Sequence, residues 1–91
     1  GNMRPIFLST SLQIVGYPQL MNERHIRLKV RQNGATFDAV GFNLAHHYNK
    51  IGVGDKPIDL VYQIDENTWQ GRTTTQLKIK DLKVQTNGKM N

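Results

Sequence analysis

Apolar and polar residues alternate with a period of two along much of this chain, the pattern expected of strands that bury one face. The clearest case is residues 25–31, where Ile, Leu and Val occupy every second position between His, Arg and Lys. Asn33-Gly34 follows, and residues 36–42 are again rich in strand formers. Because both residues of an Asn-Gly pair adopt positive φ at low cost, the two runs predict a hairpin, with Gly41 as a candidate bulge.

A second pair of strands is predicted near the C-terminal end. Residues 58–65 carry an aliphatic or aromatic side chain at every second position, with Val61 as the one apolar residue among the intervening ones, and another alternating run follows from Arg72. Between them, residues 66–71 are polar, and we expect a loop that carries Trp69. In the last strand the apolar positions change parity at Asp81. A bulge there would let one long strand curve around a barrel.

The alternation breaks after residue 42, where helical spacing replaces it. Three residues of this segment are apolar and lie three or four positions apart: Leu44, Tyr48 and Ile51. We expect a helix of about two turns, because Asn43 can cap its start and Gly52 and Gly54 can end it.

An earlier strand, which begins at Leu12 and ends near residues 16–18, completes the set. Three strands, a short helix and two strands are the plan of the OB-fold, so the predicted fold class is all-β: a five-stranded OB-fold barrel with one short helix between strands 3 and 4. With 91 residues, the chain has room for one domain. We expect residues 1–10 to be a joint from a preceding domain, residues 11–85 the OB-fold domain, and residues 86–91 a frayed tail.

The charge is strongly basic. Twelve Lys and Arg against seven Asp and Glu give a net charge of +5. Eight of the cations fall in two clusters: Arg24, Arg27, Lys29 and Arg31, and then Arg72, Lys78, Lys80 and Lys83. Five acids fall mainly between the clusters and predict a molecule with two sides of opposite potential: Asp38, Asp55, Asp59, Asp65 and Glu66. Clustered cations predict a polyanionic partner, although basic strand faces can also serve solubility alone.

An OB barrel binds nucleic acid across its second and third strands and the loops beside them. The candidate binding residues lie on these elements: Arg27, Lys29, Arg31, Trp69, Arg72, Lys78 and Lys80. Cations two residues apart on a strand are about 6.5–7 Å apart, close to the repeat of an extended nucleic-acid backbone. Trp69 could stack on a base or, alternatively, cover the open end of the core. Lys78 and Lys80 could extend the basic track or form an ordinary solvated face.

Catalytic and metal-binding patterns are absent from the sequence. The chain has no cysteine, which fits a cytoplasmic location and removes thiolate ligands. His46 and His47 are adjacent, so on a helix their side chains should diverge by about 100° and not chelate one ion. There is no apolar stretch long enough to span a membrane, and the glycine-containing segment at 52–56 matches no phosphate-binding motif. We therefore expect no catalytic residue, no metal and no cofactor in this chain.

Two stretches resemble the C-terminal domain of the RecJ family of single-strand-specific DNA exonucleases. The first is Asp65-Glu66-Asn67-Thr68-Trp69-Gln70-Gly71-Arg72, continued by Gln76-Leu77-Lys78-Ile79-Lys80-Asp81. The second joins Arg24-His25-Ile26-Arg27-Leu28 to Phe37-Asp38-Ala39-Val40-Gly41-Phe42-Asn43, and Gly1-Asn2-Met3-Arg4-Pro5-Ile6-Phe7 is similar to the joint that leads out of the family's DHH-associated domain.

The resemblance implies an OB-type domain of a larger enzyme that degrades single-stranded DNA from the 5′ end in repair and recombination. It also implies catalytic DHH and DHH-associated domains in the same polypeptide, with manganese or magnesium held by that core. The His46-His47 pair follows Ala45, not Asp, and so does not match the DHH motif. This chain would then hold the substrate strand, or, alternatively, brace the nuclease as a structural or protein-interaction domain.

Overall fold

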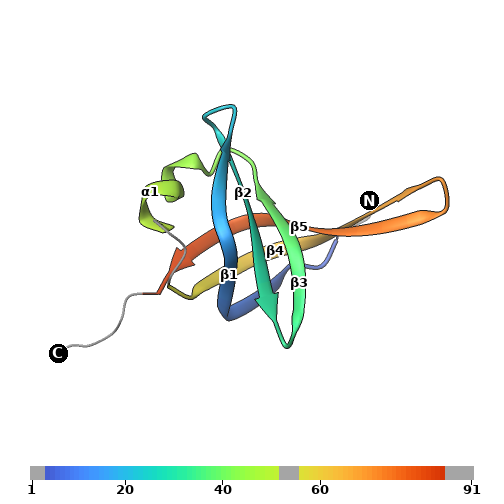
Figure 1. Ribbon diagram of the computed structural model, residues 1–91, viewed down its shortest axis with the longest axis horizontal. Helices are drawn as coiled ribbons and strands as arrows, with labels where there is room; N and C mark the ends of the chain where they lie inside the picture. The colour runs from blue at the N-terminus through green and yellow to red at the C-terminus, as the bar shows by residue number, and fades with distance from the viewer. Residues whose placement is uncertain (1–3, 52–55, 86–91) are drawn as a thin grey trace.

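The computed structural model describes residues 4–51 and 56–85 and contains a closed five-stranded barrel (Figure 1). The strands are β1 (Phe7–Met21), β2 (His25–Gln32), β3 (Ala35–Gly41), β4 (Ile58–Trp69) and β5 (Arg72–Val84). They follow one another around the barrel in the order β1-β2-β3-β5-β4, and β4 closes it by pairing with β1. Only the β3–β5 pairing is parallel. The predicted OB-fold, with a short helix between strands 3 and 4, is confirmed.

Strand β1 closes the barrel because it pairs with two neighbours. Its first part lies against β4 and its second part against β2, with a shift of register between Ser9 and Leu12. Ser11 has a φ of 57° at this bend, and its N–H donates to the Asp59 carboxylate at 3.0 Å. The limits predicted for this strand were too narrow: it begins before Leu12 and runs beyond residues 16–18. Pairing with β4 therefore brings part of the expected joint into the sheet.

The β2–β3 hairpin forms as predicted. Asn33 and Gly34 both have positive φ, 53° and 81°, as a tight turn between twisted strands requires. Gly41 is not a bulge, because it pairs in register with Ile26. Instead it allows a close approach: a Cβ atom at this position would lie 2.7 Å from Cδ1 of Leu44. The glycine thus lets the helical segment pack directly on the end of β3.

The helical segment consists of the 3-10 turn η1 (Ala45–His47) and α1 (Tyr48–Ile51). Ile51 is buried and Leu44 packs against the core, as their spacing predicts. The predicted cap is wrong: the N-cap is Leu44, without a side-chain hydrogen bond. Asn43 has a φ of 60°, and its backbone N–H donates to Nδ1 of His25 at 2.9 Å. The predicted ends of the helix, at residues 52 and 54, lie outside the described residues.

The predicted loop at 66–71 is wrong, because β4 and β5 continue as a two-stranded ribbon beyond the barrel (Figure 1). We call residues 66–75 the arm. Only Gln70 and Gly71 form the turn, with φ values of 52° and 79°. Apart from Trp69, the arm is polar on both sides, and the hydroxyls of Thr68 and Thr73 hydrogen-bond across it at 3.1 Å. The polar residues correctly indicated that this segment is exposed, but not that it is a loop. An exposed hairpin can form without a buried face, because threonines that pair across its two strands stabilise it.

A bulge in β5 gives the barrel its curvature, as predicted from the change of parity. Val61 of β4 pairs with Asp81, whereas the next residue, Tyr62, pairs with Ile79. Lys80 is therefore the extra residue, and Leu82 returns to the interior. The core consists of aliphatic residues from all five strands and the helix: Leu12, Ile26, Leu28, Val30, Ala39, Ile51, Ile58, Leu60, Leu77, Ile79 and Leu82. Within the described ranges, none of the helical segments is long and apolar enough to cross a membrane.

Candidate nucleic-acid interface

The outer side of β2 is basic. Arg27, Lys29 and Arg31 are exposed and alternate with three buried aliphatic residues. Their side chains therefore share one side of the strand, as the period of two predicts. The ion pairs within 4.0 Å that the structure contains between residues 4–51 and 56–85 are Arg4–Asp65 and His47–Asp81. Neither involves the β2 cations, so their charges are available to a partner.

The barrel adds a cation from β5 to the same side. Arg27 pairs with Val40 of β3, and Val40 pairs in turn with Lys78 of β5. Since paired residues lie on the same side of a sheet, Lys78 extends the row that begins at Arg27. We call the set Arg27, Lys29, Arg31 and Lys78 the basic face. Lys80, in contrast, is the extra residue of the β5 bulge and has no partner in the β4–β5 register.

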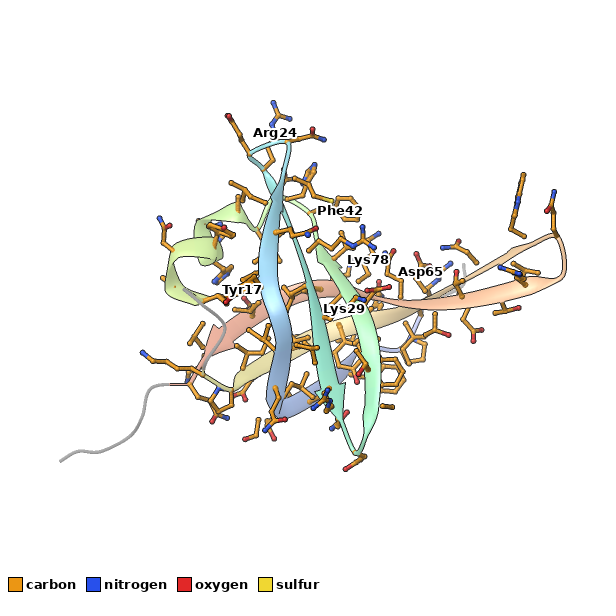
Figure 2. All side chains as sticks on the ribbon, in the orientation of Figure 1. Tyr17, Arg24, Lys29, Phe42, Asp65 and Lys78 are labelled. Carbon is orange, nitrogen blue, oxygen red and sulfur yellow. The ribbon has the colours of Figure 1, made fainter. Side chains whose placement is uncertain are left out.

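Two exposed aromatic residues border the basic face, and sequence reasoning missed both (Figure 2). Tyr17 is 77% exposed and lines a hollow together with Arg27 and Lys29. Phe42 is 50% exposed; the His25 ring packs on it edge-on at 5.1 Å, and Nζ of Lys78 lies 5.9 Å from its centroid. Flat rings beside cations are the arrangement that stacks bases while phosphates are neutralised. An aromatic residue next to Gly16 and beside a basic strand was the available signal for Tyr17.

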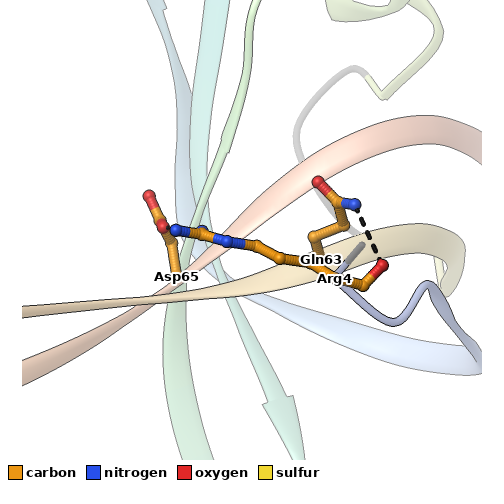
Figure 3. A network of polar contacts seen from close by, with 3 residues as sticks. All are labelled: Arg4, Gln63 and Asp65. Atoms are coloured by element: carbon orange, nitrogen blue, oxygen red, sulfur yellow. Dashed lines mark hydrogen bonds and ion pairs between the residues drawn. The ribbon is translucent and has the colours of Figure 1, made fainter. Parts of the chain in front are cut away.

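Two acids interrupt the basic face. Asp38 pairs with Lys29, and one of its carboxylate oxygens is buried without a hydrogen-bond partner among the described residues. Asp65 lies in the same row, connected through Gln76. It forms an ion pair with Arg4, whose carbonyl oxygen accepts a hydrogen bond from the Gln63 amide at 3.4 Å (Figure 3). The predicted separation of the acids from the cations therefore fails for these two residues, because strand pairing brings Asp38 beside Lys29 and places Asp65 further along the same row.

Trp69 and Arg72 are not part of the basic face. They pair with each other next to the turn of the arm, and Trp69 is 74% exposed. Figure 1 shows that the arm extends away from the barrel. The alternative reading of Trp69, as a cover over the open end of the core, is therefore wrong. Four of the seven predicted binding residues form the basic face, two lie at the tip of the arm, and Lys80 lies at the bulge.

The histidines do not form a metal site with other residues that the structure describes. In the ranges 4–51 and 56–85, no group of three or more His, Cys, Asp or Glu residues could hold an ion. The predicted divergence of His46 and His47 is wrong, because their ring centroids lie 4.2 Å apart. Burial is the main cause that lowers the pKa of His47, and the neighbouring His46 and Lys50 act in the same direction against Asp81.

One carboxylate, Asp59 on β4, is held in its charged form. The backbone N–H of Ser11 and the side-chain amide of Gln85 both donate to its Oδ1, at 3.0 and 2.8 Å. These two hydrogen bonds, in that order, lower the pKa of Asp59. Because Ser11 lies at the bend of β1, the network ties β1, β4 and the chain after β5 together. Its role is structural.

Comparison with known proteins identifies the family of the chain and supports the fold. Residues 1–81 match the family described as the RecJ OB domain. The single-stranded-DNA-specific exonuclease RecJ of Bacillus subtilis (strain 168) is 33% identical over 63 residues, which cover 69% of this chain and 8% of that protein. Among solved structures, a mitochondrial single-stranded DNA binding protein from S. cerevisiae, Rim1, has a TM-score of 0.75 at 14% identity. The superposition covers 97% of this chain and 100% of the yeast protein chain.

Proposed function

Because the chain belongs to the RecJ OB-domain family, we propose that it binds single-stranded DNA across the basic face, on behalf of a nuclease whose catalytic centre lies outside these residues. The observation that carries the proposal is the arrangement of Arg27, Lys29, Arg31 and Lys78 on one side of the barrel, without carboxylate partners within 4.0 Å among the described residues. The names of the B. subtilis exonuclease and of the yeast protein, which both refer to single-stranded DNA, support it.

Binding of this kind tolerates different base sequences in the DNA. Successive cations on β2 are about 6.5–7 Å apart and contact successive phosphates. Tyr17 and Phe42, at the borders of the basic face, stack on bases, each contributing about 1–3 kcal/mol. Release of counterions makes the affinity fall steeply with salt. Lys80, from the bulge, contributes to the general positive field.

The parent protein we propose is a 5′-to-3′ single-strand-specific exonuclease of DNA repair and recombination, acting in the cytoplasm. The chain spans only 8% of the B. subtilis relative, so a catalytic core has ample room elsewhere in such a polypeptide. We propose that its DHH and DHH-associated domains hold manganese or magnesium and hydrolyse the strand. This domain would hold that strand at high effective concentration beside them.

A second function, bracing the nuclease as an interaction domain, is favoured by one observation. Ile6 and Leu8, near the start of β1, are 62% and 66% exposed, and the neighbouring Phe7 is 40% exposed. Adjacent apolar side chains in water are typical of a docking surface. Both functions can belong to the same domain, because these residues precede the part of β1 that borders the basic face.

The test is fluorescence anisotropy with labelled oligo-dT at low salt. Reversing two charges of the basic face, Arg27→Glu with Lys29→Glu, should weaken binding by at least about tenfold, since two phosphate contacts become repulsive. The matched control is Lys50→Glu, which reverses an exposed charge on α1. Equal binding by the double variant and the control would remove the basic face from the site, and the absence of any salt-dependent affinity for oligo-dT would favour the bracing role.

A further inference from the structure

We propose that the arm is a second nucleic-acid contact, in which Trp69 stacks on the exposed end of a base stack, such as the last base pair of a duplex that flanks the bound single strand. The inference rests on the proposed function of the basic face and extends it: the domain would recognise a junction between single-stranded and double-stranded DNA.

The first observation is the exposure of Trp69. It is 74% exposed, and no described residue makes an aromatic contact with its ring. A tryptophan exposes a large apolar area, which is unfavourable in water unless a partner covers it. Trp69 is the last residue of β4 and directly precedes Gln70 and Gly71, which form the turn at the outer end of the arm. It therefore contributes little to the stability of the barrel and is placed for a ligand.

The second observation is the distribution of charge on the arm. All of its residues are exposed, yet Glu66 and Arg72 are the only charged ones. A single strand that ran along the arm would find no row of cations to neutralise its phosphates. The tip, in contrast, combines one flat ring with one guanidinium. Such a tip suits an end-on contact, in which the ring covers a base pair and Arg72 binds a nearby phosphate.

The third observation is that the arm is an ordered ribbon. Cross-strand pairing continues without a break from Glu66 and Thr75 to Trp69 and Arg72. The Thr68–Thr73 hydrogen bond and the positive φ values of the turn add to this order. The tip is thus held away from the basic face in a defined direction, so a strand on that face and a stack end at the tip can be bound together without a large cost in ordering.

Trp69 is the only tryptophan of the chain, so its fluorescence reports on the tip alone. The experiment compares oligo-dT with a DNA hairpin that carries the same oligo-dT as a tail, using the 91-residue chain. We expect the tailed hairpin to quench Trp69 more strongly and to bind about fivefold more tightly. Trp69→Ala should remove most of this advantage and Trp69→Phe only part of it. The control Thr74→Ala changes another exposed residue of the arm, and this variant should still bind the tailed hairpin more tightly than oligo-dT.

Two results would overturn the inference. If Trp69→Ala weakens binding of oligo-dT and of the tailed hairpin by the same factor, the ring stacks on an unpaired base. If both DNAs bind but leave the fluorescence of Trp69 unchanged, the arm has another partner. Failure of the proposed function is seen separately, because then Arg27→Glu with Lys29→Glu would bind oligo-dT as well as the original chain does, whatever Trp69 reports.

Discussion

The dependence of binding on salt offers a quantitative test of the basic face. Each phosphate contact on a single strand contributes about 0.7 to the slope of log K against log salt concentration. With four cations on the basic face, Arg27, Lys29, Arg31 and Lys78, the slope should be about −3. Between about 50 mM and 200 mM salt, the affinity for oligo-dT should therefore fall about 50-fold.

The perturbation is Lys29→Ala, which removes the central cation of β2. The slope should become shallower by about 0.7, because one fewer counterion is released. Anisotropy titrations over a series of salt concentrations measure it. Lys50→Ala removes the same charge from the exposed side of α1 and should leave the slope unchanged. A slope that Lys29→Ala does not change, or that both variants change equally, would refute a localised contact and leave only the net charge of the chain as the cause.

Three further predictions concern an acidic residue beside the basic face, the hydrophobic core and the dependence of stability on pH. Asp38→Asn should tighten binding of oligo-dT about threefold, because a unit charge about 7 Å from a phosphate is worth roughly 0.6 kcal/mol in water; unchanged affinity in the same titration would contradict this. Leu60→Ala, at a fully buried position of β4, should cost about 2–5 kcal/mol in urea unfolding. Because the pKa of His47 is lowered in the folded protein, the unfolded chain binds the proton more tightly. Stability should thus be full above about pH 6.5 and fall as the pH drops below that value, and His47→Gln should flatten that decline in urea titrations.

The sequence predicted the elements whose signal is local. The alternation on β2 identified which residues face the core and which face water, because strand geometry places neighbours on opposite sides regardless of what packs there. Asn33-Gly34 predicted its turn for the same kind of reason, since the conformation depends on those two residues themselves. The bulge in β5 was visible because a change of parity cannot be accommodated without an extra residue.

The errors occurred where a segment has more than one local solution. Residues 66–71 are polar, which suits a loop as well as an exposed hairpin, and cross-strand threonine pairing decided for the hairpin. Asn43 could cap a helix, but the Nδ1 acceptor of His25, eighteen positions earlier, gave its N–H a better partner. Neither the cross-strand threonine pairing nor the His25 acceptor can be recognised from the residues of the segment alone.

What the sequence by itself determined is the fold plan and the side of β2 on which Arg27, Lys29 and Arg31 lie. Only the tertiary structure decided what lies beside them. The register across β2, β3 and β5 brought Lys78 and Asp38 to the basic face, and the irregular pairing of β1 with β2 between Val15 and Gln19 placed Tyr17 beside it. The β4–β5 pairing carried Trp69 away from that face on the arm. The physical reason is that the two properties have different origins. Neighbouring residues determine the side of a strand that a residue faces, whereas register depends on barrel closure and on bulges distributed over the whole chain.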